Sequence, residues 1–203
     1  MAYVLGFFTA DGCMIKNNRG AHFIEFYITD KDLLIKIKEV LGCDHKLSRK
    51  ETRDGCKTAY RLQLGSKEMF NDLLLLGFTP RKSNIVTLPK IPNKYFFHFV
   101  RGYFDGDGNV FFGRRKDRRN KNFILQVGFT CGSEIFLQEL YKKIKLLSNI
   151  VGGSLCKSSR AYRLQFSIND SLVLYALMYN NVLNDLFLER KRIVFSKYLN
   201  MDR

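Results

Sequence analysis

Two short runs of the chain end in an aspartate and a glycine, and these aspartates are the residues whose type and spacing could do chemistry. The runs are residues 4–12 (VLGFFTADG) and 100–108 (VRGYFDGDG). Each is predicted to be a short helix with small residues four apart on one face, which lets two helix backbones approach closely. Asp11 and Asp107 then lie at helix C-termini, where partial negative charge disfavours a carboxylate.

Pairing of the two helices would bring these carboxylates together, and each would raise the pKa of the other. A hard divalent cation with oxygen ligands would neutralise the two negative charges, and Mg²⁺ is the ion expected. For one copy alone, a solvated Asp-Gly turn would be the simpler interpretation, but two matched copies favour a shared site. Gly12 and Gly108 are expected to end the helices in the left-handed conformation.

The composition favours a polyanionic partner. The chain has 203 residues, of which 46% are hydrophobic, so it can form a proper core. A net charge of +15 indicates nucleic acid before an anionic membrane. No apolar run approaches the ~18 residues of a spanning helix, and the N-terminus does not resemble a signal peptide. Five cysteines without a C-x-x-C and three scattered histidines predict an intracellular protein without a zinc site or a Ser-His-Asp triad.

Alternating and helical patterns predict the same order of elements twice. Serine or aspartate residues are expected to cap several of the helices. The predicted strands are 13–16, 23–29, 45–50, 59–64, 109–112, 125–130, 154–157 and 162–168, and the predicted helices, besides the two runs, are 32–41, 66–75, 133–147 and one or two within 171–198.

An internal duplication defines the architecture. The segment 59–64 (AYRLQL) recurs as 161–166 (AYRLQF), and we also match Phe23-Ile24 with Phe123-Ile124 and 26–29 with 127–130. All three prolines fall within 79–93, which is the predicted linker. We therefore predict an α+β fold of two pseudo-twofold-related α-β-β-α-β-β-α repeats, residues 1–93 and 94–203, whose antiparallel sheets form a DNA-binding saddle.

The solvent-facing sides of the predicted strands carry side chains that suit DNA binding. Arg, Lys and Gln read guanine and adenine edges in the major groove, which a β-ribbon can enter. The alternative is a charged sheet face that is simply solvated, and the sequence does not separate base contacts from phosphate contacts. The candidate DNA-binding residues are Lys16, Arg19, Arg61, Gln63, Arg114, Lys116, Gln126, Arg163 and Gln165.

The two runs resemble the LAGLIDADG motif, and the chain from Tyr3 to about Tyr198 resembles a single-chain, two-repeat LAGLIDADG homing endonuclease. The resemblance implies that the motif helices join the halves of a monomer acting as a pseudo-dimer on double-stranded DNA. It implies that Asp11 and Asp107 bind catalytic Mg²⁺ and that both strands are cut, leaving short 3′ overhangs. Mn²⁺ is expected to substitute, and Ca²⁺ to bind without supporting cleavage.

The resemblance also implies a basic residue near each half of the catalytic site. Lys82 and Lys191 are the positions that fit, with solvated linker charge as the alternative. Backbone carbonyls of Ala10 and Gly106 are expected to complete the metal coordination. We therefore take Asp11, Asp107 and the two lysines as catalytic candidates.

Two other functions remain open on the same scaffold. One is an intron RNA maturase, which the family also contains, and the other is a non-cutting DNA-binding regulator. The intact aspartates argue against the regulator, and Thr9, where the second copy has Asp105, lies at a position that varies in the family. The target sequence and the host intron do not follow from the sequence, nor does the choice between cytoplasm, nucleoid, mitochondrion and chloroplast.

Overall fold

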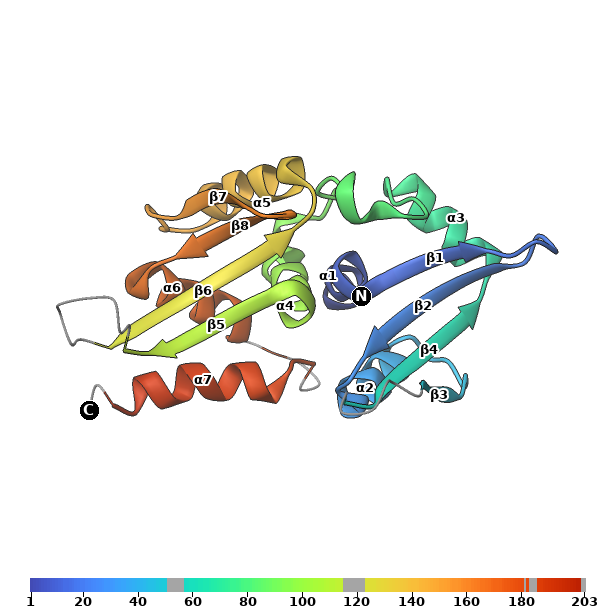
Figure 1. Cartoon of the computed structure of the whole chain (residues 1–203), viewed down its shortest axis with the longest axis horizontal. Helices are drawn as coiled ribbons and strands as arrows, with labels where there is room; N and C mark the ends of the chain where they lie inside the picture. Colours follow the sequence, from blue (N-terminus) through green and yellow to red (C-terminus); the bar gives the residue numbers. More distant parts are fainter. Residues whose placement is uncertain (51–56, 115–122, 181, 183–185, 202–203) are drawn as a thin grey trace.

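The structure is a computed structural model that describes residues 1–50, 57–114, 123–180, 182 and 186–201. Two helices lie side by side at the centre, and a four-stranded antiparallel sheet lies on either side of them (Figure 1). Within the described ranges, no helix has both the length and the apolar character needed to cross a membrane.

The first half contains the predicted order of elements. Its sheet, called the N-terminal sheet, has the strand order β1-β2-β4-β3. The elements are α1 (Ala2–Asp11), β1 (Gly12–Lys16), β2 (His22–Ile28), α2 (Lys31–Val40), β3 (Leu47–Lys50), β4 (Ala59–Gly65) and α3 (Lys67–Leu75).

The second half repeats this order and adds one helix. Its sheet, the C-terminal sheet, has the order β5-β6-β8-β7, and the added helix α7 lies beside β5 (Figure 1). The elements are α4 (Phe96–Asp107), β5 (Gly108–Gly113), β6 (Ile124–Cys131), α5 (Glu134–Leu147), β7 (Ser154–Ser158), β8 (Ala161–Phe166), α6 (Ile168–Tyr179) and α7 (Glu189–Leu199). The predicted α+β class and the duplicated topology are confirmed.

The sequence correctly predicted which residues cap the starts of two helices. The hydroxyl of Ser66 accepts a hydrogen bond from the Met69 amide at 3.1 Å, and that of Ser133 accepts one from the Phe136 amide at 3.3 Å. Both serines therefore cap their helices as predicted. The last strand was predicted too long, because β8 ends at Phe166 and α6 already begins at Ile168.

The predicted match of Phe23-Ile24 with Phe123-Ile124, and of 26–29 with 127–130, is wrong in register. Phe26 pairs with Gly12, whereas Phe129 pairs with Gly108, so Phe26 and Phe129 are the equivalent residues. A pair of similar apolar residues does not define register, whereas the pairing that starts at the end of each motif helix does.

Aromatic packing repeats in the two halves and supports this register. Phe7 stacks on Phe26 with ring centroids 6.3 Å apart, and Tyr103 stacks on Phe129 at the same distance. Phe8 and Phe104 meet the same two rings edge-on. All of these rings are buried, and they belong to one core that runs through both halves. The division into two domains at residue 93 stays a prediction.

The central helices α1 and α4 touch through reciprocal glycines. A Cβ atom on Gly6 would overlap the carbonyl group of Phe99, and a Cβ atom on Gly102 would overlap that of Tyr3. The backbones therefore approach too closely for any side chain at these two positions. The small-residue face predicted from the two motifs is the interface between the halves.

Gly12 and Gly108 do not have the left-handed conformation that was predicted. Their φ angles are −88° and −83°, and the extended chain enters β1 and β5 directly. Glycine is needed here for space, because a Cβ atom would lie 2.5 Å from the carbonyl oxygen of Phe8 or Phe104. The helix ends are thus continuous with the strands that begin each sheet.

Candidate active site

The paired helices bring Asp11 against the second motif. A Cβ atom on Gly106 would lie 3.1 Å from Oδ2 of Asp11, so this carboxylate meets the C-terminal end of α4 next to Asp107. Burial raises the pKa of Asp11 to about 6, and the charge of Asp107 adds to this rise. Burial also raises the pKa of Asp107. Two partly buried carboxylates thus share the seam between the halves, as the sequence predicted.

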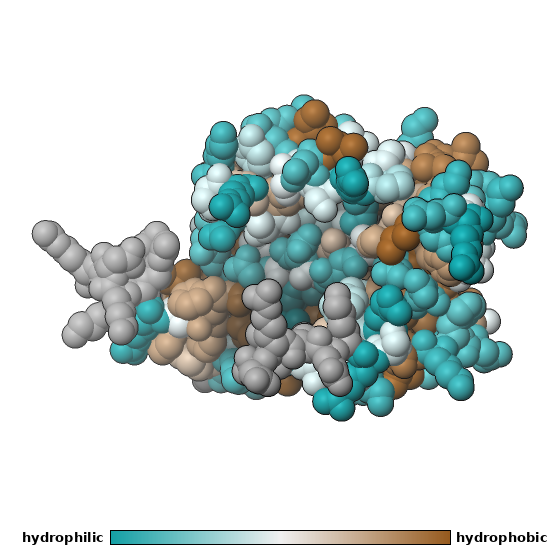
Figure 2. All heavy atoms as spheres, turned by 45° about the vertical axis from the view of Figure 1, so that its right-hand side comes forward, coloured by the Kyte–Doolittle hydropathy of each residue, from teal (hydrophilic) through white to brown (hydrophobic). Residues whose placement is uncertain are grey.

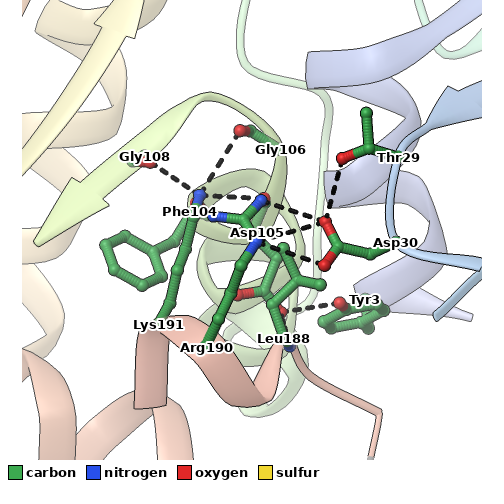
Figure 3. A network of polar contacts seen from close by, with 10 residues as sticks. All are labelled: Tyr3, Thr29, Asp30, Phe104, Asp105, Gly106, Gly108, Leu188, Arg190 and Lys191. Atoms are coloured by element: carbon green, nitrogen blue, oxygen red, sulfur yellow. Dashed lines mark hydrogen bonds and ion pairs between the residues drawn. The ribbon is translucent and has the colours of Figure 1, made fainter. Parts of the chain in front are cut away.

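Lys82 and Lys191 bind the carbonyl oxygens at the ends of the motif helices. The ammonium group of Lys82 donates to the carbonyl of Thr9 at 2.8 Å. That of Lys191 donates to the carbonyls of Asp105 at 2.8 Å and Gly108 at 2.6 Å, and also contacts those of Phe104 and Gly106 (Figure 3).

Both lysine side chains are 6% exposed, and burial lowers the pKa of both, that of Lys191 to about 8. Their charges oppose the rise in the pKa of Asp11 and Asp107. Lys82 and Lys191 therefore neutralise the negative ends of α1 and α4. Their proposed catalytic role stays a prediction, and their hydrogen bonds favour a role in positioning the carboxylates.

Asp105 makes the second half different from the first. It is 1% exposed, and its Oδ2 accepts hydrogen bonds from the Tyr3 hydroxyl at 2.7 Å and the Leu188 amide at 2.9 Å (Figure 3). Burial raises its pKa to about 6 in spite of these bonds. Thr9, which replaces it in the first motif, donates its hydroxyl proton to the carbonyl of Leu5 within α1. Asp105 therefore connects α4 with α1 and with the segment before α7.

Two arginines that sequence reasoning did not identify anchor the region around the start of α7. Arg190 forms an ion pair with Asp30 of the first half at 3.1 Å (Figure 3). Arg101, which is 2% exposed, donates to the carbonyls of Leu186 at 3.1 Å and Met178 at 2.5 Å. A charged residue inside an apolar motif helix was the available signal for Arg101, because such a group is buried only when it is paired.

The oxygen donors at the ends of the motif helices fit a hard divalent cation that is also coordinated by water and by substrate phosphates. Among the described residues, no group of three or more His, Cys, Asp or Glu side chains could hold a metal ion. The available donors are the carboxylates of Asp11 and Asp107 and carbonyls near the helix ends, including the predicted Ala10 and Gly106. Such oxygen donors suit Mg²⁺, which keeps waters and binds substrate phosphates in addition to one or two carboxylates.

The polar faces of both sheets carry most of the predicted DNA-binding residues. Arg61 and Gln63 lie on β4, and Arg163 and Gln165 occupy the equivalent positions on β8. Lys16 ends β1, Gln126 lies on β6, and the exposed Arg19 and Arg114 lie in the turns at the far ends of the hairpins. Lys116 lies outside the described residues. On the face seen in Figure 2, hydrophilic residues cover most of the surface between separate hydrophobic patches.

A surface pocket of about 460 Å³ joins the polar face of the N-terminal sheet to Asp11. It connects the end of α1 with strands β1 to β4 and contains an acid that was not predicted, Glu25. Its lining residues are Asp11, Cys13, Glu25, Tyr27, Ser48, Arg49 and Arg61.

The raised pKa of Asp11 predicts a pH-dependent effect of its replacement. Above pH 6 the folded protein holds an ionised, partly buried Asp11, which costs about 3 kcal/mol relative to the unfolded chain. Asp11→Asn should therefore unfold at higher urea than the wild type at pH 7.5. This advantage should shrink as the pH falls through 6 towards 4, where the wild-type carboxylate is protonated in the folded state.

Urea unfolding of both proteins at several pH values measures this difference and cancels the effect of charges that do not interact with Asp11. Added Mg²⁺ should stabilise only the wild type at pH 7.5, since two ionised carboxylates attract the ion. A variant that is less stable than the wild type at every pH would contradict the assigned cost of ionising Asp11.

A duplicated α+β scaffold with a close helix pair and one carboxylate from each half at its seam defines the LAGLIDADG class of fold. Residues 1–74 match the family model described as LAGLIDADG-like domain. That part of the chain is similar to a LAGLIDADG-like domain, and the resemblance noted in the motifs is confirmed. No match to the chain was found among curated protein sequences.

Solved structures extend the likeness to the whole chain. The homing endonuclease I-SmaMI bound to cleaved DNA has 12% identity and a TM-score of 0.64, with 99% of this chain and 89% of that chain covered. I-DmoI in complex with DNA and Mn has 13% identity and a TM-score of 0.60, with coverage of 90% and 97%. The N-terminal LAGLIDADG domain of DUF199/WhiA has 17% identity and a TM-score of 0.58, with coverage of 91% and 82%. The fold is that of LAGLIDADG homing endonucleases.

Proposed function

We propose that the protein is a site-specific homing endonuclease that makes divalent-metal-dependent double-strand cuts in a long DNA target and leaves short 3′ overhangs. The observation that carries this proposal is the pair Asp11 and Asp107, one from each half, at the seam between two polar sheet faces. The structures of I-SmaMI with cleaved DNA and of I-DmoI with DNA and Mn support it through their shared fold.

Recognition of the target begins with charge. The net charge of +15 attracts the phosphate backbone. Arg61 and Gln63 of one sheet and Arg163 and Gln165 of the other then face the grooves of the duplex. Binding should weaken steeply with salt, with a log–log slope of about −0.9 for each phosphate that the protein neutralises.

The aspartates face one scissile phosphate on each strand, because the pseudo-twofold axis of the halves matches that of the DNA. Mg²⁺, or Mn²⁺ in its place, supplies Lewis acidity and an activated water when it is bound. Asp11 and Asp107 in their ionised form would hold the ion, together with the carbonyls of Ala10 and Gly106. The nearby charges of Lys82 and Lys191 favour the ionised form of both carboxylates.

We propose that the protein acts as a monomer, since its two halves already supply both aspartates. We further propose that it is encoded by an intron and works inside the cell, on DNA of the nucleoid or of an organelle. An intron RNA is the alternative partner, and a splicing cofactor would bind that RNA without cutting DNA.

Cleavage of a randomised duplex library tests the proposal. The expected result is that a small set of related sequences is cut with Mg²⁺ or Mn²⁺, while the same set is bound but left intact with Ca²⁺. The double variant Asp11→Asn/Asp107→Asn serves as the control for contaminating nuclease and should cut nothing. Selective binding without cleavage in Mg²⁺ would contradict the nuclease and favour a DNA-binding regulator, whereas binding of intron RNA alone would favour a maturase.

A further inference from the structure

The two sheets differ at one central position of their polar faces. In the N-terminal sheet, Glu25 lies on β2 between Cys13 of β1 and Gln63 of β4. In the C-terminal sheet, the same position of the ladder belongs to Gly128. This equivalence follows from the pairing register and could not be seen in the sequence alignment of the two repeats.

The second half fills this place in a different way. Gly128 lies between Asn109 of β5 and Gln165 of β8, and a Cβ atom on it would lie 2.5 Å from Oδ1 of Asn109. The Asn109 side chain therefore lies over Gly128. The first half thus presents a carboxylate where the second half presents a neutral amide.

Glu25 is held in place by the predicted DNA-binding residues of its own sheet. Its Oε1 accepts a hydrogen bond from Nε2 of Gln63 at 2.6 Å and forms an ion pair with Nη1 of Arg61 at 3.5 Å. The Arg61 guanidinium also donates to the Ser48 hydroxyl at 3.1 Å. The side chain of Glu25 is 14% exposed, whereas that of Arg61 is 40% exposed. The carboxylate is therefore fixed before any ligand binds.

A carboxylate on this surface suits neither a phosphate nor a metal ion. Its charge repels DNA phosphates, and among the described residues no three acidic, Cys or His side chains gather to hold a metal. Two carboxylate oxygens offer about four acceptor positions, of which the contacts to Gln63 and Arg61 use part. In the major groove, the amines of cytosine (N4) and adenine (N6) donate hydrogen bonds, but adenine N6 lies next to the N7 acceptor, which disfavours a carboxylate, so the N4 amine of cytosine matches best.

We propose that Glu25 determines specificity in the half-site that the N-terminal sheet binds. It accepts a hydrogen bond from the N4 amine of a cytosine and fixes the amide of Gln63 and the guanidinium of Arg61 for the neighbouring base pairs. Because Glu25 and Asp11 line the same pocket, these base pairs lie next to the cleavage positions. The proposal rests on the proposed DNA-binding function and adds an asymmetry between the two half-sites.

Selection of bound duplexes from the randomised library in Ca²⁺ tests this role without any dependence on cleavage. Glu25→Gln keeps the shape but gives an amide that can both donate and accept. The variant should lose about tenfold of its preference for cytosine at one base pair of one half-site. Preferences in the other half-site should remain unchanged. Glu39→Gln, which removes the same charge from an exposed position on helix α2, should leave every preference unchanged.

A second variant separates positioning from simple charge removal. Gln63→Ala alone should relax the base pair beside that of Glu25, and Glu25→Gln should relax the same pair in part. An unchanged base preference in Glu25→Gln, with only a uniform rise in affinity for all duplexes, would overturn the proposal. Failure of the wild type to select any duplex would instead overturn the proposed function itself, and the role of Glu25 with it.

Discussion

Replacement of either Asp11 or Asp107 by asparagine is expected to abolish double-strand cleavage. Each change leaves the shape of the side chain but removes one of the two charges that, in the proposed function, would hold a divalent ion between the halves. We expect a loss of about 10³-fold or more in the cleavage rate, as when a key electrostatic group is removed from an active site. Binding of the target in Ca²⁺ should stay within a few-fold of the wild-type affinity.

Rates of cleavage of a target duplex selected from the library, measured with Mg²⁺ under single-turnover conditions, provide the readout. Asp72→Asn is the matched control, because Asp72 is exposed on α3, and it should cut as fast as the wild type. Near-normal cleavage by both active-site variants would refute the assignment of the aspartates. Loss of binding together with cleavage would show that the substitutions disturb the interface and not the chemistry.

Gly102→Ala is expected to destabilise the protein strongly. The added methyl group would overlap the carbonyl oxygen of Tyr3 on the facing helix, and that oxygen cannot move without its backbone. Overpacking of a rigid contact costs about 3 kcal/mol in the free energy of unfolding, and α1 and α4 must separate to relieve it. Gly6→Ala should have a similar effect, because its methyl group would overlap the carbonyl group of Phe99.

Denaturant unfolding of the metal-free protein measures this cost. Gly65→Ala is the matched control, since a Cβ atom on Gly65 would lie at an ordinary distance of 3.7 Å from the Phe23 ring. Its free energy of unfolding should change by no more than about 0.5 kcal/mol. Equal stability of Gly102→Ala and the wild type would contradict the close contact of the two helices.

The sequence was sufficient to predict the fold because its signals agree with one another. The two motif runs and the repeated segment 59–64 indicate the same duplicated topology, and the caps at Ser66 and Ser133 mark the starts of α3 and α5. The register of β6 could not be predicted, because Phe23-Ile24 and Phe123-Ile124 look alike although Ile24 pairs with Met14 and Ile124 pairs with Gly113. Backbone conformation at Gly12 was also missed, because spacing does not distinguish a glycine needed for φ from one needed for room.

For the site, sequence reasoning brought Asp11 and Asp107 together but could not give the surroundings of each charge. Lys191 was placed near the site, yet its four carbonyl partners arise only because α7 packs beside β5, next to the end of α4. The buried pairing of Asp105 with Tyr3 joins residues from opposite halves. Glu25 looked like one more polar residue of a half-exposed strand, and its distinct position appears only after the ladders are compared.

The reciprocal contact of Gly6 and Gly102 limits how this protein could be recombined with others. Each glycine makes room for the backbone of the opposite half, so neither half can adjust by changes within itself. A chimera that takes one half from a different protein would need a small residue at the same place and a helix crossing of the same depth. Engineers who exchange halves to combine two target preferences should therefore transplant this helix face unchanged and vary only the strands.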